Sequence, residues 1–252
     1  MNTICGITMV KNAVKYDYCI KEAIESMLPV CDHVICVYVE SEDGTLEILN
    51  SIDSNKLQII ELPESEWDVI QGKERLSYIT NIGIQSADKL GFTYVLYVQA
   101  DEVLSEKSYD SIKKAVNDNQ EAYMCRRINL WKSPYLELDV PINRLPCSNY
   151  VIRLAKVRYR AVDDAESIGA HCNFDYAEQI KIWHMGFVRK KEVMKSKIIN
   201  MQVGVFSMGD YDRKLDMAEV FNPDLWFNPE EDLKPISEPL PQLIENWAFE
   251  RR

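Results

Sequence analysis

The sequence predicts an α/β fold, built on a largely parallel central sheet that helices cover on both faces. Four short apolar runs, rich in β-branched residues, end in polar loops, at 4–9, 33–39, 57–62 and 94–100. Stretches with apolar residues at helical spacing separate these runs along the chain. Strands that alternate with helices are typical of parallel sheets buried on both faces.

Each of the first three helices carries its own signals. The first is predicted over 18–28, where apolar residues recur at helical spacing and Pro29 ends the run. Asp43-Gly44-Thr45 makes a turn, after which a short helix starts at Leu46. The third helix, over 76–90, leads into the fourth strand and completes the alternating pattern.

The chain after residue 104 has a different texture. A helix is predicted over 105–118, strands over 124–130, 150–157 and 180–183, and a last helix over 190–202. The loop between the first two of these strands carries Pro134, Pro141 and Pro146. So long a loop is expected to lie over a site rather than in the core.

The end of the chain is acidic and rich in proline. Residues 207–252 hold eleven acids and five bases, and five prolines follow Phe221. We predict a main domain over 1–206, with halves 1–104 and 105–206, and an extended, turn-rich extension over 207–252 that packs on it. The expected anchors of this extension are Leu225, Trp226, Phe227 and Trp247.

Composition excludes several classes of protein. With 252 residues and 46% hydrophobic content, the chain can bury a large core. No apolar run reaches the roughly 20 residues of a membrane helix, and the amino terminus lacks the pattern of a signal peptide. The seven cysteines include no Cys-x-x-Cys pair, so we expect reduced core cysteines rather than a zinc site. We therefore expect a cytoplasmic protein without a membrane span.

Charge is unevenly distributed, although the net charge is −11. Residues 126–160 hold eight Lys/Arg and two acids, and residues 181–197 hold six and one. Such a basic strip either meets the phosphates of a sugar nucleotide or a nucleic acid, or is a solvated face with ordinary ion pairs.

The fourth apolar run carries the most informative residues. It reads Y-V-L-Y-V-Q-A-D-E-V-L over 94–104, so Asp101 and Glu102 are predicted at the carboxyl end of a strand. In open α/β sheets ligands bind at that edge. A carboxylate there can hold a divalent cation against a diphosphate. The alternative is that Asp101 caps the following helix, with Ser105 as a competing cap.

Several motifs, in this order, resemble one family. Val10-Lys11-Asn12, Ser41 with Asp43-Gly44-Thr45, and Gln99-Ala100-Asp101-Glu102 follow the first, second and fourth strands. Trp183-His184-Met185-Gly186-Phe187-Val188-Arg189 is similar to the His-x-Gly-Trp-Val-Arg segment of bacterial and phage members. Over roughly residues 3–200 the chain thus resembles family 2 glycosyltransferases of the GT-A fold, with Gln-Ala-Asp-Glu in place of the Asp-x-Asp motif.

The resemblance implies a Rossmann-like GT-A sheet, a nucleotide-sugar-binding half over 1–104 and an acceptor half over 105–206. It also implies Mn²⁺ or Mg²⁺ held by Asp101, with His184 in contact with the metal or the diphosphate, a set of ligands that suits these ions. The alternative is that His184 is a structural histidine. Gln99 stands where the family has an acid, and beside Ala100 it can contact a ribose or a bound water. Arg189 and Lys195, by the same resemblance, neutralise the departing diphosphate.

A donor pocket is expected at the ends of the first two strands and on the third helix. The residues assigned to it are Thr8, Val10, Asn12, Tyr38, Glu40, Asp43 and Asn81. Tyr38 stands where many members have an acid that binds uracil. Either the base contact moves to Glu40 or Asp43, or Tyr38 stacks on the base. Asn81 matches an asparagine near the diphosphate, or is a polar helix residue.

An inverting transfer needs a general base, normally a carboxylate within hydrogen-bond reach of the acceptor hydroxyl. The segment Val162-Asp163-Asp164-Ala165 resembles an Asp-Ala segment of the same family. Asp164 is our preferred base and Asp163 the alternative. Two neighbouring acids in a loop are also common in solvated turns.

Three functions compete. The first is a metal-dependent, inverting transfer from a nucleoside-diphosphate sugar, by preference a UDP-sugar, to a hydroxyl of a glycan, a protein or a modified DNA base. The second is nucleotidyl transfer, although 8–13 lacks the glycines of the phosphate-binding loop usual in such enzymes. The third is an inactive sugar-nucleotide or carbohydrate-binding module, which detectable donor hydrolysis would exclude.

Overall fold

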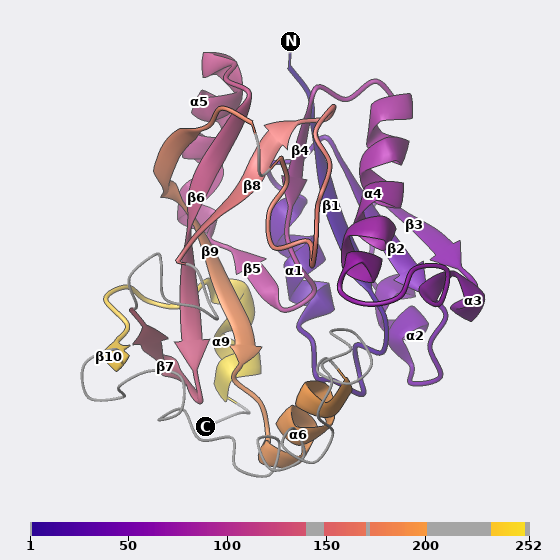
Figure 1. Cartoon of the computed structure of the whole chain (residues 1–252). Coiled ribbons are helices and arrows are strands. Elements are labelled where there is room, and N and C mark those ends of the chain that lie inside the picture. The colour runs from indigo at the N-terminus through magenta and orange to yellow at the C-terminus, as the bar shows by residue number, and fades with distance from the viewer. Residues whose placement is uncertain (1, 140–148, 170–171, 201–232, 250–252) are drawn as a thin grey trace.

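A computed structural model of the chain describes residues 2–139, 149–169, 172–200 and 233–249. Its centre is a ten-stranded mixed sheet with helices on both faces (Figure 1). The strand order is β10-β7-β6-β8-β4-β1-β2-β3, and β9 pairs with both β5 and β6. The α/β class predicted from the sequence is confirmed.

The first half of the chain forms the parallel part of the sheet. Its strands are β1 (Ile4–Val10), β2 (His33–Val39), β3 (Leu57–Leu62) and β4 (Tyr94–Tyr97). β1 pairs with β2 on one side and with β4 on the other, and β2 also pairs with β3. All three pairings are parallel. The carboxyl ends of these strands therefore meet at one edge, where the polar loops gather.

The second half extends this sheet mainly with antiparallel strands. They are β5 (Glu102–Leu104), β6 (Ala122–Trp131), β7 (Ser133–Leu138), β8 (Tyr150–Lys156) and β9 (Asp175–Phe187). β8 pairs antiparallel with β4 and joins the two halves, whereas β9 runs parallel to β6. Two predictions change here. β7 occupies part of the predicted loop after residue 130, and β9 is much longer than 180–183. The part of the loop over 140–148 lies outside the described residues.

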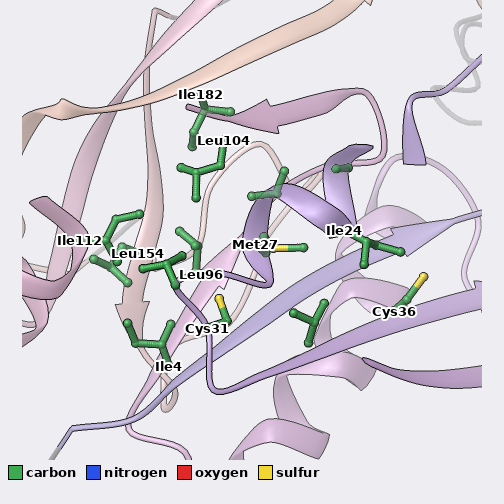
Figure 2. Close-up of a cluster of buried hydrophobic side chains, with 14 of the residues drawn as sticks. Ile4, Ile24, Met27, Cys31, Cys36, Leu96, Leu104, Ile112, Leu154 and Ile182 are labelled. Atoms are coloured by element: carbon green, nitrogen blue, oxygen red, sulfur yellow. The ribbon is translucent and has the colours of Figure 1, made fainter. Parts of the chain in front are cut away.

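Side chains of the parallel strands alternate between two hydrophobic clusters. Ile4 belongs to a cluster that α1 (Ile20–Met27), α2 (Thr45–Asn50) and α5 (Tyr109–Asp118) cover, and Figure 2 shows part of it. Cys5 belongs to the cluster under α4 (Glu74–Lys89) on the opposite face. A Cβ at Gly83 of α4 would lie 3.0 Å from Val37 and 3.1 Å from Ile7, so this glycine lets the helix approach the sheet closely.

Shorter elements complete the described fold. They are α3 (Glu64–Trp67), the single turn η1 (Glu106–Ser108), α6 (Lys191–Ile199), β10 (Leu233–Pro235) and α9 (Gln242–Phe249). Trp247 of α9 is buried in a third cluster with Cys19, Val103 and Trp183. The predicted extension is thus helical over 242–249 rather than extended, and its other expected anchors, 225–227, lie outside the described residues.

Two further sequence-based expectations concern composition. Six of the seven cysteines fall in the described residues, all six are unpaired, and five of them are buried. None of the described helices combines the length and the apolarity that crossing a membrane requires.

Candidate functional site

Asp101 lies in a tight turn at the carboxyl edge of the parallel strands. β4 ends at Tyr97, and the Glu102 amide donates to the Gln99 carbonyl at 3.0 Å, which closes the turn. β5 then pairs with β9 so that Glu102 lies opposite His184. The predicted position of Asp101 at the sheet edge is therefore confirmed. The helix predicted over 105–118 is present as η1 and α5, but β5 separates it from Asp101, so Asp101 does not cap it.

Positive groups surround one oxygen of Asp101. Lys197 Nζ donates to Asp101 Oδ2 at 2.8 Å, and a guanidinium nitrogen of Arg189 lies 3.4 Å from the same atom. Burial alone would raise the pKa of the Asp101 carboxyl, but the Lys197 ammonium, together with Arg189, holds that pKa well below its usual range. Asp101 is therefore an anion at neutral pH, and it needs a cation beside it because buried unpaired charges are costly.

His184 faces the same carboxylate oxygen. Its Nε2 lies 3.8 Å from Asp101 Oδ2, while its Nδ1 contacts Asn129 Oδ1 at 2.8 Å. Burial lowers the pKa of His184 to about 3, so the ring is neutral at pH 7 and forms no ion pair with Asp101. A Cβ at Gly186 would collide with the imidazole, which explains the glycine of this motif.

Arg189 is enclosed by protein. Its side chain is fully buried, Nε donates to the Tyr16 carbonyl at 2.7 Å, and one terminal nitrogen donates to the carbonyls of Met185 and Gly186. Its guanidinium also lies 5.1 Å from the centre of the Tyr18 ring. Arg189 thereby connects the loop after β1 to the end of β9. Because its side chain is enclosed, it would act on a bound ligand through its positive charge beside Asp101 and not through direct contact.

A second charged cluster, Glu102, Arg153, Arg127 and Glu166, lies directly behind Asp101. Arg153 donates to Glu102 Oε1 at 2.6 Å with both side chains fully buried, and Arg127 lies 3.7 Å from the same oxygen. The other arm of Arg153 donates to the Glu166 carbonyl at 2.8 Å, and the Glu166 carboxylate pairs with Arg127. Glu102 Oε2 also accepts the Gln99 amide at 3.0 Å. The cluster connects the Asp101 turn to the loop that contains Glu166.

That loop carries the two predicted bases. Asp163 is exposed and pairs with Lys73 at 2.9 Å, and Ala165 is held at φ 57°, which is strained for a residue with a Cβ. Burial, with Glu166 nearby, raises the pKa of Asp164. Of the two, Asp164 is the more buried.

Asn81 and Gln99 hold the same loop in place. The amide of Asn81 exchanges two hydrogen bonds with the Ala161 main chain, at 2.9 and 2.8 Å. Gln99 Nε2 lies 3.3 Å from the Ala165 carbonyl. Both side chains are thus engaged with the loop rather than presented to a diphosphate or a ribose.

Three of the residues expected at the nucleotide form hydrogen bonds with neighbouring loop residues. The amide of Asn12, at φ 56°, donates to Ser41 Oγ at 2.9 Å, and Asp43 Oδ2 accepts the Lys15 amide at 2.7 Å. Tyr38 is only 4% exposed, packs in the core and accepts the Ser41 amide. This placement does not support stacking of Tyr38 on a base, because its ring is enclosed on the hydrophobic side of the sheet.

The other predicted donor residues divide between core and surface. Thr8, Val10 and Ala100 are buried, and no hydrogen-bond partner of Thr8 Oγ1 is found among the described residues. Glu40 is exposed and accepts the Glu64 amide at 3.2 Å. Lys195 is half-buried on α6.

Asp101 and His184 are too few to hold a divalent cation by themselves, so water or a bound substrate would have to supply further ligand atoms. Among the described residues, no group of three or more His, Cys, Asp or Glu side chains is placed to hold a metal ion. Asp101 and the neutral His184 supply two suitable donors, and hard cations often take their remaining ligands from water and substrate phosphates. Asp101 and His184 would therefore leave the remaining ligand positions of such a cation to water or to a substrate.

Three features of the site were not predicted from the sequence. They are the contact of Lys197 with Asp101, the ion pair of Glu102 with Arg153, and the contact of Asn129 with His184. Lys197 lies three residues after the buried Met194, so helical spacing could have placed it on the inward face of α6. Asn129 and Arg127 alternate inside an apolar strand, a pattern that indicates buried polar partners. No local signal pairs Glu102 with Arg153, which is 51 residues away.

A comparison with protein-family models and with curated proteins finds no match. Among solved structures, residues 1–349 of TarS from S. aureus are similar, with a TM-score of 0.48 and 14% identity over 91% of this chain and 73% of that chain. The structure of the same protein in complex with UDP gives a TM-score of 0.47, with the same identity and coverage. A Bacillus anthracis protein described as a glucose-1-phosphate thymidylyltransferase, in complex with a sucrose, gives a TM-score of 0.41. Its identity is 10% over 62% of this chain and 72% of that chain. Such identities transfer no ligand or activity to this chain.

Proposed function

We propose that the protein transfers a sugar from a nucleoside-diphosphate sugar to an acceptor hydroxyl at Asp101 and His184. The observation that carries this proposal is the pairing of a buried carboxylate with a neutral imidazole nitrogen 3.8 Å away, at the carboxyl edge of a parallel sheet. In the structure, Lys197 and Arg189 supply the positive charge beside this carboxylate. We propose that a divalent cation bound with an anionic donor takes the place of the Lys197 ammonium.

Asp101 and His184 would hold Mn²⁺ or Mg²⁺. When bound, such an ion neutralises charge on the diphosphate leaving group. Lys197 is the residue of this chain best placed to add to that effect, since its side chain is 14% exposed and its ammonium already lies at Asp101. Arg189 stays buried and fixes the loop after β1, so its contribution is to position Asp101 and to add positive potential.

The acceptor would bind on the side of the loop 161–166. Asp164 is the proposed general base, because burial raises the pKa of its carboxyl and so makes its carboxylate a stronger base. Asp163 is the weaker candidate, since Lys73 neutralises it. A base that takes the acceptor proton while the diphosphate leaves from the opposite face gives inversion at the sugar carbon.

Thermal stabilisation by a panel of nucleoside-diphosphate sugars, with and without Mn²⁺, tests the proposal. A bound donor raises the melting temperature by mass action, and we expect the largest rise with a UDP-sugar and Mn²⁺ together. Product analysis then separates the candidate functions. Release of a nucleoside diphosphate indicates sugar transfer, release of pyrophosphate indicates nucleotidyl transfer, and stabilisation without turnover indicates a binding module. No stabilisation by any donor would refute the proposal.

A further inference from the structure

A chain of three side-chain amide and carboxylate groups leads to the imidazole of His184. Asn149 Nδ2 lies 3.5 Å from Asp139 Oδ1, Asn129 Nδ2 donates to Asn149 Oδ1 at 2.8 Å, and Asn129 Oδ1 contacts His184 Nδ1 at 2.8 Å. The chain crosses the sheet from the end of β7 through the start of β8 and then β6 to β9. Asn129 and His184 are direct neighbours in the β6–β9 pairing.

The carboxylate of Asp139 favours one direction for the hydrogen bonds of this chain. An ionised carboxylate only accepts hydrogen bonds, so the Asn149 amide must turn its NH₂ toward Asp139. Its oxygen then accepts from the NH₂ of Asn129, and the oxygen of Asn129 faces His184. An amide oxygen cannot donate, so His184 Nδ1 carries the proton and Nε2 carries the lone pair.

The environment of each group supports this direction. Asp139 also receives Lys234 Nζ at 2.7 Å, and this hydrogen bond lowers the pKa of the Asp139 carboxyl, which keeps it an acceptor. Asn129 is fully buried and Asn149 is 2% exposed, so water has little access to compete for these amides. A buried amide that turned the wrong way would leave a donor facing a donor, which is costly.

We propose that Asp139 and Asn149, acting through Asn129, are positioning residues that fix the tautomer of His184 so that its Nε2 lone pair faces Asp101. The link to cation binding rests on the proposed function, in which Asp101 and His184 hold the metal with the donor. None of the three residues touches the donor or the metal. Their effect is to prevent His184 from presenting an Nε2–H group, which would donate to Asp101 Oδ2 and exclude a cation.

Nitrogen-15 NMR of histidine-labelled, metal-free protein reads the tautomer directly. The chain has three histidines, and a His184→Gln variant assigns the signal. In the wild type at pH 7 we expect a protonated Nδ1 and an unprotonated Nε2. The opposite tautomer in the wild type would overturn the proposal before any variant is made, and this result does not depend on whether the protein is a transferase.

Variants of Asn149 test the relay. In Asn149→Leu the Asn129 amide loses its hydrogen bond to Asn149, so we expect His184 to shift toward Nε2–H and the affinity for Mn²⁺ to fall by roughly 10- to 100-fold, the usual range for lost support of a ligand. Asn149→Asp keeps an oxygen toward Asn129, so we expect it to retain the wild-type tautomer. A folded Asn149→Leu protein with an unchanged tautomer refutes the relay.

A milder variant guards against misfolding of Asn149→Leu. Asp139 is 41% exposed, so Asp139→Asn leaves the core intact while it removes the group that accepts only. We expect a mixture of the two tautomers and a smaller loss of Mn²⁺ affinity. The matched control is Asp88→Asn, which breaks a similarly exposed ion pair with Arg160. Equal spectra of Asp139→Asn and the control would refute the proposal, whereas a wild type that binds neither Mn²⁺ nor a donor would refute the proposed function and the metal link alone.

Discussion

Substitution of Lys197 by methionine is expected to tighten, not weaken, the binding of Mn²⁺ to the free protein. Lys197 Nζ lies 2.8 Å from Asp101 Oδ2, the atom that also faces His184. A divalent cation held by Asp101 and His184 must take the place of this ammonium. Methionine keeps the length and packing of the lysine stem but cannot occupy the position of a cation.

The size of the effect follows from the interaction that the cation must displace. Both side chains are largely enclosed, with exposed fractions of 14% for Lys197 and 11% for Asp101, so solvent screens the pair weakly. A hydrogen bond to a charged group contributes about 1.5–3 kcal/mol. Each 1.4 kcal/mol is a factor of ten in affinity, so the dissociation constant for Mn²⁺ should fall by roughly 10- to 100-fold. Donor turnover should fall at the same time, because Lys197 no longer assists the leaving group.

Calorimetric titration of the metal-free protein with Mn²⁺ measures this affinity. The matched control is Lys190→Met, which removes an exposed charge just before α6 without touching Asp101. The control should bind Mn²⁺ about as tightly as the wild type. Equal or weaker binding by Lys197→Met would mean that the ammonium does not occupy the cation position, and the arrangement proposed for the metal would be wrong.

Four further outcomes are expected. Asp101→Asn should reduce transfer by more than about 100-fold at an unchanged fold, as followed by product formation and circular dichroism; wild-type turnover would remove Asp101 from the site. Asp164→Asn should bind donor and metal normally yet lose roughly 100-fold in transfer, and near-normal kinetics would leave the base unassigned. Arg153→Met should cost about 3–5 kcal/mol in denaturant unfolding, because it leaves Glu102 buried without its closest partner; a loss below 1 kcal/mol would contradict this. His184 has a pKa of about 3 when folded and near 6.5 when unfolded, so the unfolded chain binds the extra proton between these values and stability falls as the pH falls. Without metal, the wild type should lose about 2 kcal/mol more than His184→Gln between pH 7 and 5, and parallel curves would refute the shift.

The parallel half of the fold could be predicted because its signals are local. β1, β2 and β3 coincide closely with apolar runs, and the helices between them have an apolar stripe and clear ends. The shared site of Asp101 and His184 was expected from the family resemblance, and the structure brings the two within 3.8 Å. The position of Asp101 followed from its own sequence, because the carboxyl ends of parallel strands share one edge. His184 instead lies within β9, which pairs antiparallel with β5.

The second half depended on contacts that no local pattern shows. β9 was expected only over 180–183, because its first residues are polar and exposed and lack the alternation of a half-buried strand. Arg189 was expected at a diphosphate, but its position at the end of β9 lets the Tyr16 carbonyl and the carbonyls of its own turn enclose it. Charged residues that pair across fifty or more positions are invisible to periodicity, so the Arg153–Glu102 pair was not predicted.

The absence of charge on Gln99 gives these unpredicted contacts their importance. Gln99 faces the Ala165 carbonyl and brings no charge, so the proposed cation site relies on the Asp101 carboxylate, which lies 3.8 Å from His184 Nε2. With a single anionic ligand, the neutral nitrogen of His184 carries a larger share of the binding, and its orientation matters more. Lys197 is expected to lower the affinity for a cation, since its ammonium pairs with Asp101 whenever no metal is bound. The affinity for a cation is therefore expected to depend on two residues that sequence motifs do not mark, a lysine that competes and an asparagine that aligns the imidazole.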